Sequence, residues 1–155
     1  MADNQAGRDL RALFRQQPIG DTFRLSFMAN SLVLPVYDEI KRRHGLNRGE
    51  YLLIHCLSFV PVMTAQDVAR VTGRPRNSIS RAVHRMLEEE LIARAPDPED
   101  GRRAMLTVTP KGRALVDTIM PLFRAQQEAL LAPLSGEERQ QLDRLLGKLT
   151  GSAPI

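Results

Sequence analysis

Apolar residues recur along the first part of the chain at the three- and four-residue spacing of amphipathic helices. The spacing predicts a helix over residues 21–44, and Pro35 is expected to kink or split it because proline lacks an amide proton. A second helix is expected after Asn47, since Asn47 and Glu50 have the spacing of a capping box. Apolar residues cover this second helix on nearly every side, which predicts that it is buried.

Two shorter amphipathic segments follow, separated by a glycine. The first is expected to begin at Thr64, with Asp67 as its capping-box partner, and to end at Gly73. The second is expected over residues 75–89, with Pro75 just inside its start, where the fixed φ of proline suits a helix. Two helices joined by a glycine turn form the helix-turn-helix pattern.

The pattern then changes from the helical period to short strand-like runs. Residues 92–95 and 105–108 are expected to be two strands, and the Pro, Asp and Gly residues between them predict a hairpin connection. Thr109 and Pro110 are expected to start a long helix that is interrupted at Pro121. The order of elements predicts a mainly α fold with a small β-hairpin wing (α+β), that is, a winged helix-turn-helix with helices at both ends of the chain.

Three segments are expected from this order. Residues 1–45 form a tail and a dimerisation helix, residues 46–112 the winged helix-turn-helix lobe, and residues 113–155 the C-terminal dimerisation helices. The lobe is expected to need only residues 46–115 for its own core. The last helix should begin with a capping box at Ser135 and Glu138. One of its faces carries four leucines, which are Leu142, Leu145, Leu146 and Leu149. Such a face requires a partner, so a homodimer formed through the chain ends is predicted.

Positive charge is concentrated on the second helix of the helix-turn-helix. The whole chain has a formal net charge of +4, which permits an anionic partner but decides little. Between Asp67 and Glu88, however, there is no acidic residue, whereas arginines recur. Arginine can bind guanine and asparagine can bind adenine through two hydrogen bonds each. The residues expected to contact double-stranded DNA on this helix are Arg74, Arg76, Asn77, Ser78 and Arg81.

A second set of candidate contacts lies on the wing, residues 93–108. Arg102 and Arg103 follow the turn at Asp100 and Gly101, and long cations on a protruding hairpin can enter a minor groove. Asp100 is expected to hold one of these arginines in place. The competing interpretations are a solvated helix face and a surface turn with an ion pair of little energetic value. The combination of a basic second helix with a basic hairpin favours DNA binding.

At these residues the chain resembles the MarR (multiple antibiotic resistance regulator) family. The wing tip DPEDGRR followed by VTPKG matches the family's pattern, and the resemblance covers residues 46–115. Val108 stands where the family usually has leucine, and Pro75 where it often has a capping serine. The resemblance implies a triangular homodimer with intertwined terminal helices that binds a pseudo-palindromic operator. It also implies that Asn77, Ser78 and Arg81 lie near bases and Arg102 in the minor groove, and that the protein is a repressor released by a small ligand.

Four residues are candidates for binding such a ligand. Phe23, Phe27, Tyr51 and His55 could line an aromatic pocket where the terminal helices meet the lobe, although a core position is the more common role for any one of them. Cys56, the single cysteine, could be a redox sensor, but its apolar helix favours a packing role.

Other classes of function have less support. The chain has no P-loop, no paired His-Glu zinc motif, no nucleophile elbow and no dinucleotide fingerprint, so an enzyme is not expected. The three histidines are scattered and no metal or other cofactor is expected. A non-specific architectural DNA binder and a protein-binding winged helix remain as alternatives, which the base-competent polar face disfavours. The absence of a signal-like N-terminus and of a long apolar run predicts a soluble, cytoplasmic protein.

Overall fold

The structure is a computed structural model that describes residues 18–98, 100 and 103–151. Its elements, in chain order, are the helices α2 (Gly20–His44), α3 (Arg48–Phe59), α4 (Ala65–Thr72) and α5 (Arg76–Glu88), the strands β1 (Ile92–Pro96) and β2 (Ala104–Val108), and the helices α6 (Pro110–Leu131) and α7 (Gly136–Thr150). This is the predicted winged helix-turn-helix with terminal helices. Residues of the expected N-terminal tail up to residue 17 lie outside the described part.

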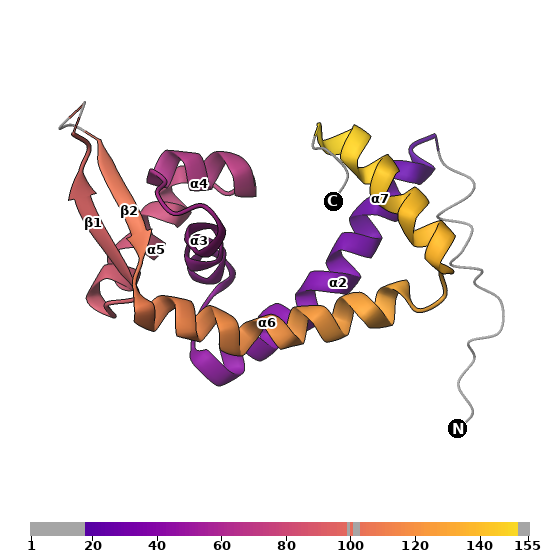
Figure 1. The fold of residues 1–155 in the computed structure, drawn as a ribbon, viewed down its shortest axis with the longest axis horizontal. Helices are drawn as coiled ribbons and strands as arrows, with labels where there is room; N and C mark the ends of the chain where they lie inside the picture. The colour runs from indigo at the N-terminus through magenta and orange to yellow at the C-terminus, as the bar shows by residue number, and fades with distance from the viewer. Residues whose placement is uncertain (1–17, 99, 101–102, 152–155) are drawn as a thin grey trace, which may run out of the picture.

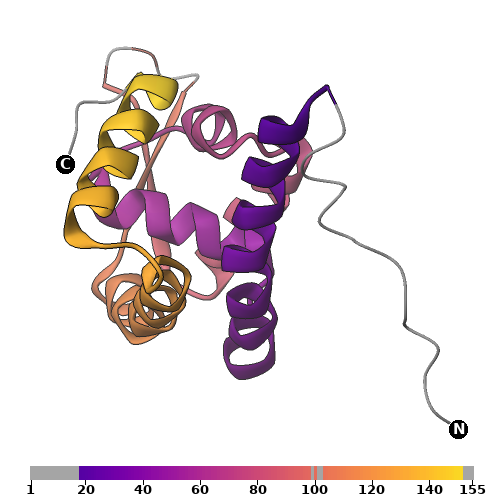
Figure 2. The same cartoon turned by 90° about the vertical axis from the view of Figure 1, so that its right-hand side faces the viewer.

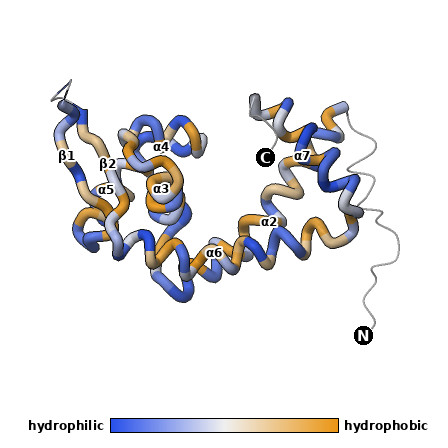
Figure 3. The backbone as a smooth tube through the Cα atoms, viewed as in Figure 1, coloured by the Kyte–Doolittle hydropathy of each residue, from blue (hydrophilic) through white to orange (hydrophobic). Residues whose placement is uncertain are grey.

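The elements are arranged as two bodies joined by long helices. The lobe of α3, α4, α5, β1 and β2 lies at one end, and α6 runs from the hairpin towards the opposite end, where α7 and the start of α2 lie (Figure 1). Viewed from the side, α7 and the first half of α2 stand apart from one another (Figure 2). Hydrophobic residues recur both inside the lobe and along α2 and α7 (Figure 3).

Capping boxes set three of the helix starts as the sequence predicted. In α3 the Asn47 side chain accepts hydrogen bonds from the amides of Gly49 and Glu50, and the Glu50 carboxylate accepts one from the Asn47 amide at 2.7 Å. The Thr64–Asp67 and Ser135–Glu138 pairs do the same for α4 and α7. Because each box satisfies amides that the helix leaves unbonded, these starts are fixed by local sequence.

The hairpin closes one side of the lobe core. Antiparallel pairing runs from Ile92 opposite Val108 to Pro96 opposite Ala104, and Met63 adds an isolated bridge to Leu106. The core itself draws on more than the expected lobe of residues 46–112, since its buried side chains include Val36 and Ile40 of α2 and Val116 and Ile119 of α6. The expectation that the lobe needs only residues 46–115 for its own core is therefore wrong.

Two prolines lie inside helices that are not split, whereas a kink or a split was expected at Pro35 and an interruption at Pro121. In α2, Pro35 has no amide proton to give to the carbonyl of Ser31, and the side-chain amide of Gln126 from α6 donates to that carbonyl instead, at 3.1 Å. The packing of α6 along α2 supplies this substitute hydrogen bond, which the local sequence cannot reveal. Pro121 likewise lies within an unbroken α6.

One glycine fits only because it has no side chain. Gly112 lies in the first turn of α6, where Thr109 is the N-cap and accepts a hydrogen bond from the Gly112 amide at 3.1 Å. A Cβ atom at Gly112 would stand 2.1 Å from the backbone carbonyl oxygen of Leu91. The Thr-x-x-Gly spacing after the wing thus combines a helix cap with a close approach of two backbones.

We predict that Gly112→Ala lowers the free energy of unfolding by about 3 kcal/mol, because the added methyl group meets backbone that cannot rotate away. The measurement is thermal or urea unfolding. Gly136→Ala is the matched control, since it adds the same atom to the first turn of α7 with nothing within 4 Å. Equal stability of the two variants would contradict the prediction.

Candidate nucleic-acid interface

The side of α5 that faces away from the core carries polar and basic residues. Asn77, Ser80, Arg81 and His84 recur at helical spacing and are exposed, opposite the buried Ile79, Ala82 and Met86. We call these four residues the open face of α5. Arg76 is also exposed, at the edge of this face. The exposure expected for Arg76, Asn77 and Arg81 is confirmed, whereas Ser80 and His84 were not expected to contact DNA, although their spacing from Asn77 indicated the same side.

Two other candidates lie differently from the expectation. Ser78 is half-buried, and its hydroxyl packs against Gly49 at the start of α3, where an added Cβ would lie 3.3 Å away. Arg74 is half-buried as well, with its Nε atom buried and without a hydrogen-bond partner among the described residues. Arg74 precedes the helix and turns towards the lobe, so it does not share the open face of α5.

The start of α5 also differs by one residue from the expectation. Pro75 is the N-cap, with φ −57° and ψ 138°, and not the first helical residue, so α5 begins at Arg76. No side chain caps this helix start. The N-terminus of a helix carries partial positive charge and amide donors, which favour a phosphate.

Arg85, which belongs to the basic run of α5, points inward. Its guanidinium donates to the Glu50 carboxylate at 2.8 Å, to the Gly45 carbonyl at 3.1 Å and to the Glu89 carboxylate at 2.8 Å. Glu50 is buried and also closes the capping box of α3 at Asn47. Hydrogen bonds to Glu89 and Glu50 raise the pKa of Arg85 above its ordinary value. Arg85 thus fixes α5 against the start of α3 and the end of α2.

We expect Arg85→Met to lower the free energy of unfolding by about 2 kcal/mol, because a buried Glu50 carboxylate loses its charged partner. Arg81→Met removes the same charge from the exposed side of the same helix and should leave the melting temperature unchanged. Melting curves of the two variants provide the test. The structural role assigned to Arg85 would be refuted by equal melting temperatures.

In the described part of the wing tip Arg103 lies near an aspartate, and the expected role of Asp100 stays a prediction. The Arg103 guanidinium lies 3.9 Å from the carboxylate of Asp97, which was not among the predicted residues. Asp100 contributes its backbone carbonyl, which accepts from the Arg103 amide at 2.8 Å. Arg102 lies outside the described residues. The hairpin therefore presents at least one cation, Arg103, oriented by an acidic neighbour.

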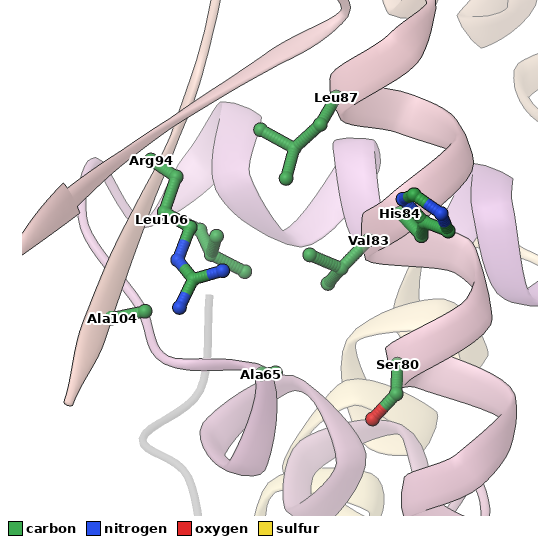
Figure 4. A pocket seen from close by; sticks show the side chains of 8 residues that line it. All are labelled: Ala65, Ser80, Val83, His84, Leu87, Arg94, Ala104 and Leu106. Carbon is green, nitrogen blue, oxygen red and sulfur yellow. The ribbon is translucent and has the colours of Figure 1, made fainter. Parts of the chain in front are cut away.

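A groove separates α5 from the hairpin. It has a volume of about 340 Å³ and is lined by Ala65, Ser80, Val83, His84, Leu87, Arg94, Ala104 and Leu106. The Arg94 guanidinium reaches from β1 into the groove, where Val83 and Leu87 face it from α5 (Figure 4). Arg94 was not a predicted site residue, and no local motif marks it.

The four candidate ligand residues do not line one pocket within the chain. Phe23 and Phe27 border a shallow groove of about 400 Å³ formed by α2 residues 23–35. Tyr51 and His55 lie elsewhere, in a ring cluster in which Tyr51 stacks on Phe123 at a centroid distance of 5.2 Å. Tyr37, ten residues beyond Phe27 and therefore about 15 Å further along α2, also contacts Tyr51. Within one protomer the four candidates thus form two separate groups, and their role in binding a ligand stays a prediction.

The ring cluster is polar at its edge. The Tyr51 hydroxyl and His55 Nδ1 share a hydrogen bond of 3.0 Å, and Arg48 stands over the Tyr37 ring at 4.9 Å. Burial lowers the pKa of His55 and raises the pKa of Tyr37, so both side chains favour their neutral forms. The cluster, completed by Phe59 next to His55, lies where α2, α3 and α6 meet.

Burial raises the pKa of the half-buried Cys56 thiol as well. A raised pKa disfavours the reactive thiolate, which supports the packing role for Cys56. Among residues 18–98, 100 and 103–151, no group of three or more histidine, cysteine, aspartate or glutamate side chains is placed to hold a metal ion. In the same part of the chain, no helix has both the length and the apolarity to span a bilayer.

Similarity to known proteins agrees with this geometry. A model of the MarR family matches residues 44–103, which run from the end of α2 to the start of β2. The HTH-type transcriptional regulator BilQ of Clostridium symbiosum is 27% identical over 108 residues, which cover 70% of this chain and 75% of the relative. The similarity to the MarR family therefore covers the helix-turn-helix and the first strand of the wing. The relatives that it resembles over about 70% of its length are named as HTH-type transcriptional regulators or repressors.

Other relatives and structures extend the likeness. The homoprotocatechuate degradative operon repressor of Escherichia coli is 25% identical over 118 residues, covering 76% of this chain and 80% of the relative. A mutant E. coli MarR in complex with operator DNA matches the fold with a TM-score of 0.68 and 17% identity over 92% of this chain and 99% of that one. Bordetella bronchiseptica BpsR, whose DNA binding is regulated by 6-hydroxynicotinic acid, matches with a TM-score of 0.67 and 22% identity over 86% of this chain and 99% of that one.

Proposed function

We propose that this protein is a homodimeric repressor that binds a pseudo-palindromic operator and is released from it by a small aromatic ligand. The open face of α5 carries the proposal. It combines an arginine, an asparagine, a serine and a histidine and has no acidic residue. Arg85 ties the same helix to Glu50 of α3, so this face points away from the core. Arginine and asparagine read guanine and adenine in the major groove, so Arg81 and Asn77 are the proposed base-reading residues.

Other residues around α5 and on the wing are proposed to contact the DNA backbone or to support the helix. Arg76 stands beside the uncapped start of α5, where a phosphate is favoured. Arg103 and, outside the described residues, Arg102 would enter the adjacent minor groove. Arg74 and Ser78, half-buried at the turn and against α3, are proposed to act by supporting the helix rather than by reading bases.

Asn77→Ala and Arg81→Ala should each lower the preference for the operator over random duplex by about 1–3 kcal/mol, because a bidentate contact to a base edge is lost. The operator is first obtained by selecting bound duplexes from a random pool, and the discrimination is then measured by fluorescence anisotropy. Gln66→Ala, exposed on α4, is the control. If neither variant loses discrimination, α5 does not read sequence, and uniform footprints along any duplex would favour an architectural DNA binder instead.

The dimer is supported by apolar surface at the end remote from the lobe. Leu145, Leu146 and Leu149 of α7 are 50%, 41% and 72% exposed, and Phe27 of α2 is 54% exposed. Among the described residues α7 has an ion pair to α6, from Arg139 to Glu128 at 2.9 Å, but no extensive packing against another helix. A second copy could bury these faces and place two α5 helices about 34–36 Å apart, the spacing of successive major grooves.

Leu149→Arg should therefore shift the protein towards monomer and weaken operator binding, because the variant places a charge in the proposed interface. Sedimentation velocity measures the mass, and anisotropy measures the binding. Val71→Arg is the control, since Val71 of α4 is equally apolar and 69% exposed but lies on the lobe. A parent protein that sediments as a monomer would disprove the dimer.

For the ligand, we propose the ring cluster of Tyr37, Tyr51, His55, Phe59 and Phe123 as the binding region. Flat apolar rings suit an aromatic ligand, and Arg48 next to Tyr37 suits its carboxylate. In BpsR, an aromatic acid of this kind, 6-hydroxynicotinic acid, regulates DNA binding. A ligand releases DNA only if it binds the DNA-free state more tightly than the bound one.

We predict that an aromatic acid from a panel that includes 6-hydroxynicotinic acid raises the dissociation constant of the operator complex. In Arg48→Met the same acid should act only at higher concentration, because the cation facing its carboxylate is gone. The measurement is a ligand titration of the preformed complex. A panel that changes neither operator affinity nor melting temperature would contradict this part of the proposal.

A further inference from the structure

We propose that Arg94, together with Ser80 and His84, binds a phosphate of the DNA strand that crosses the groove between α5 and the hairpin. The contact depends on the proposed DNA-binding function and adds to it an anchor that lies between the two reading elements. Three observations carry the proposal: the side of the hairpin on which Arg94 lies, the composition of the groove, and the path that DNA must follow.

Arg94 lies on the side of the hairpin where an apolar residue is expected. It is paired with Leu106, which is 1% exposed and belongs to the core. Directly opposed residues of an antiparallel pair project from the same face, so Arg94 shares the inner face with Leu106, while Ala93 and Ala95 occupy the outer face. An inner arginine between two outer alanines reverses the usual arrangement of a half-buried strand.

The groove offers this arginine no acidic partner. None of its lining residues is a carboxylate, and Arg94 has no ion pair with any described residue. Ser80 and His84 provide hydrogen-bonding groups from the α5 side (Figure 4). The nearest carboxylate on α5 is that of Glu88, which lies 3.7 Å from His84 Nε2. This groove suits a phosphodiester. The phosphate would contact the cation and the two polar groups, and the sugar would contact the apolar side chains that line the rest of the groove.

The geometry of a bound duplex brings such a group to the groove. If α5 lies in a major groove and the hairpin tip enters the neighbouring minor groove, one sugar–phosphate strand separates the two grooves and must pass between the two elements. The groove of Arg94 lies between α5 and β2, on that path. A phosphate contact here would set the depth of α5 without reading sequence.

The test compares Arg94→Met with Arg124→Met in the full-length protein. Both variants remove one positive charge from an exposed arginine, but Arg124 lies on α6, away from the groove. We measure the dissociation constants of the selected operator and of a random duplex over a salt titration. Loss of one phosphate contact should reduce the salt slope by about one and weaken both complexes roughly eightfold at 0.1 M salt. Arg94→Lys should restore most of the slope, since it restores the charge.

The outcomes separate this inference from the proposed function. A slope for Arg94→Met equal to that for Arg124→Met, with a parent that prefers its operator, would overturn the phosphate contact and leave the proposed function intact. Weakening confined to the operator would also overturn it, because that result indicates base reading. A parent without any operator preference would overturn the proposed function. The melting temperatures of the variants are measured as well, and values equal to that of the parent exclude repacking of the hairpin as the cause.

Discussion

The ion pair between Arg85 and the buried Glu50 is the interaction on which the geometry of the winged helix-turn-helix lobe depends. Glu50 uses one carboxylate both to cap α3 at Asn47 and to accept from Arg85, and the same guanidinium reaches the carbonyl of Gly45 at the end of α2. Residues 45–50, which join α2 to α3, and Arg85 near the end of α5 thus share one charged centre, although 35 residues separate Glu50 from Arg85. Because a buried carboxylate without its partner is costly, the orientation of α5 is coupled to the integrity of the fold.

This centre divides the arginines of α5 into two kinds. Arg85 is committed to the fold, whereas Arg81, one turn earlier, projects outward and forms no ion pair with another described residue. A count of basic residues cannot separate the two kinds, since both belong to the same acid-free run. The separation requires the position of Glu50, which lies 35 residues before Arg85.

Local chemistry explains which features the sequence could predict. The capping boxes at Asn47, Thr64 and Ser135 depend on residues three positions apart, so the helix starts were predicted correctly, and the hairpin followed from its turn residues. The open face of α5 was found in part, because helical period alone places Asn77 and Arg81 outward. Features that depend on distant segments were missed: the tie from Gln126 to Ser31, the contact of Gly112 with Leu91, and the groove around Arg94. For the aromatic residues, composition suggested one pocket, but their distance along α2 separates Phe27 from the rings around Tyr51.

The proline in α2 gives the molecule a point of reduced stiffness. At Pro35 the ladder of backbone hydrogen bonds lacks one rung, and the side chain of Gln126 takes its place from a different helix. Bending of α2 there would stretch a side-chain contact and leave the remaining backbone ladder in place. The missing hydrogen bond lies at the end of the α2 groove that is nearer to the ring cluster at Tyr37, that is, between the end that would hold a second protomer and the lobe that would hold DNA. In the proposed homodimer, a change in the length of the hydrogen bond from Gln126 to Ser31 would therefore alter the bend of α2. Such a bend would move the α5 helix of one protomer relative to that of the other and change the distance between the two half-sites that the dimer can bind.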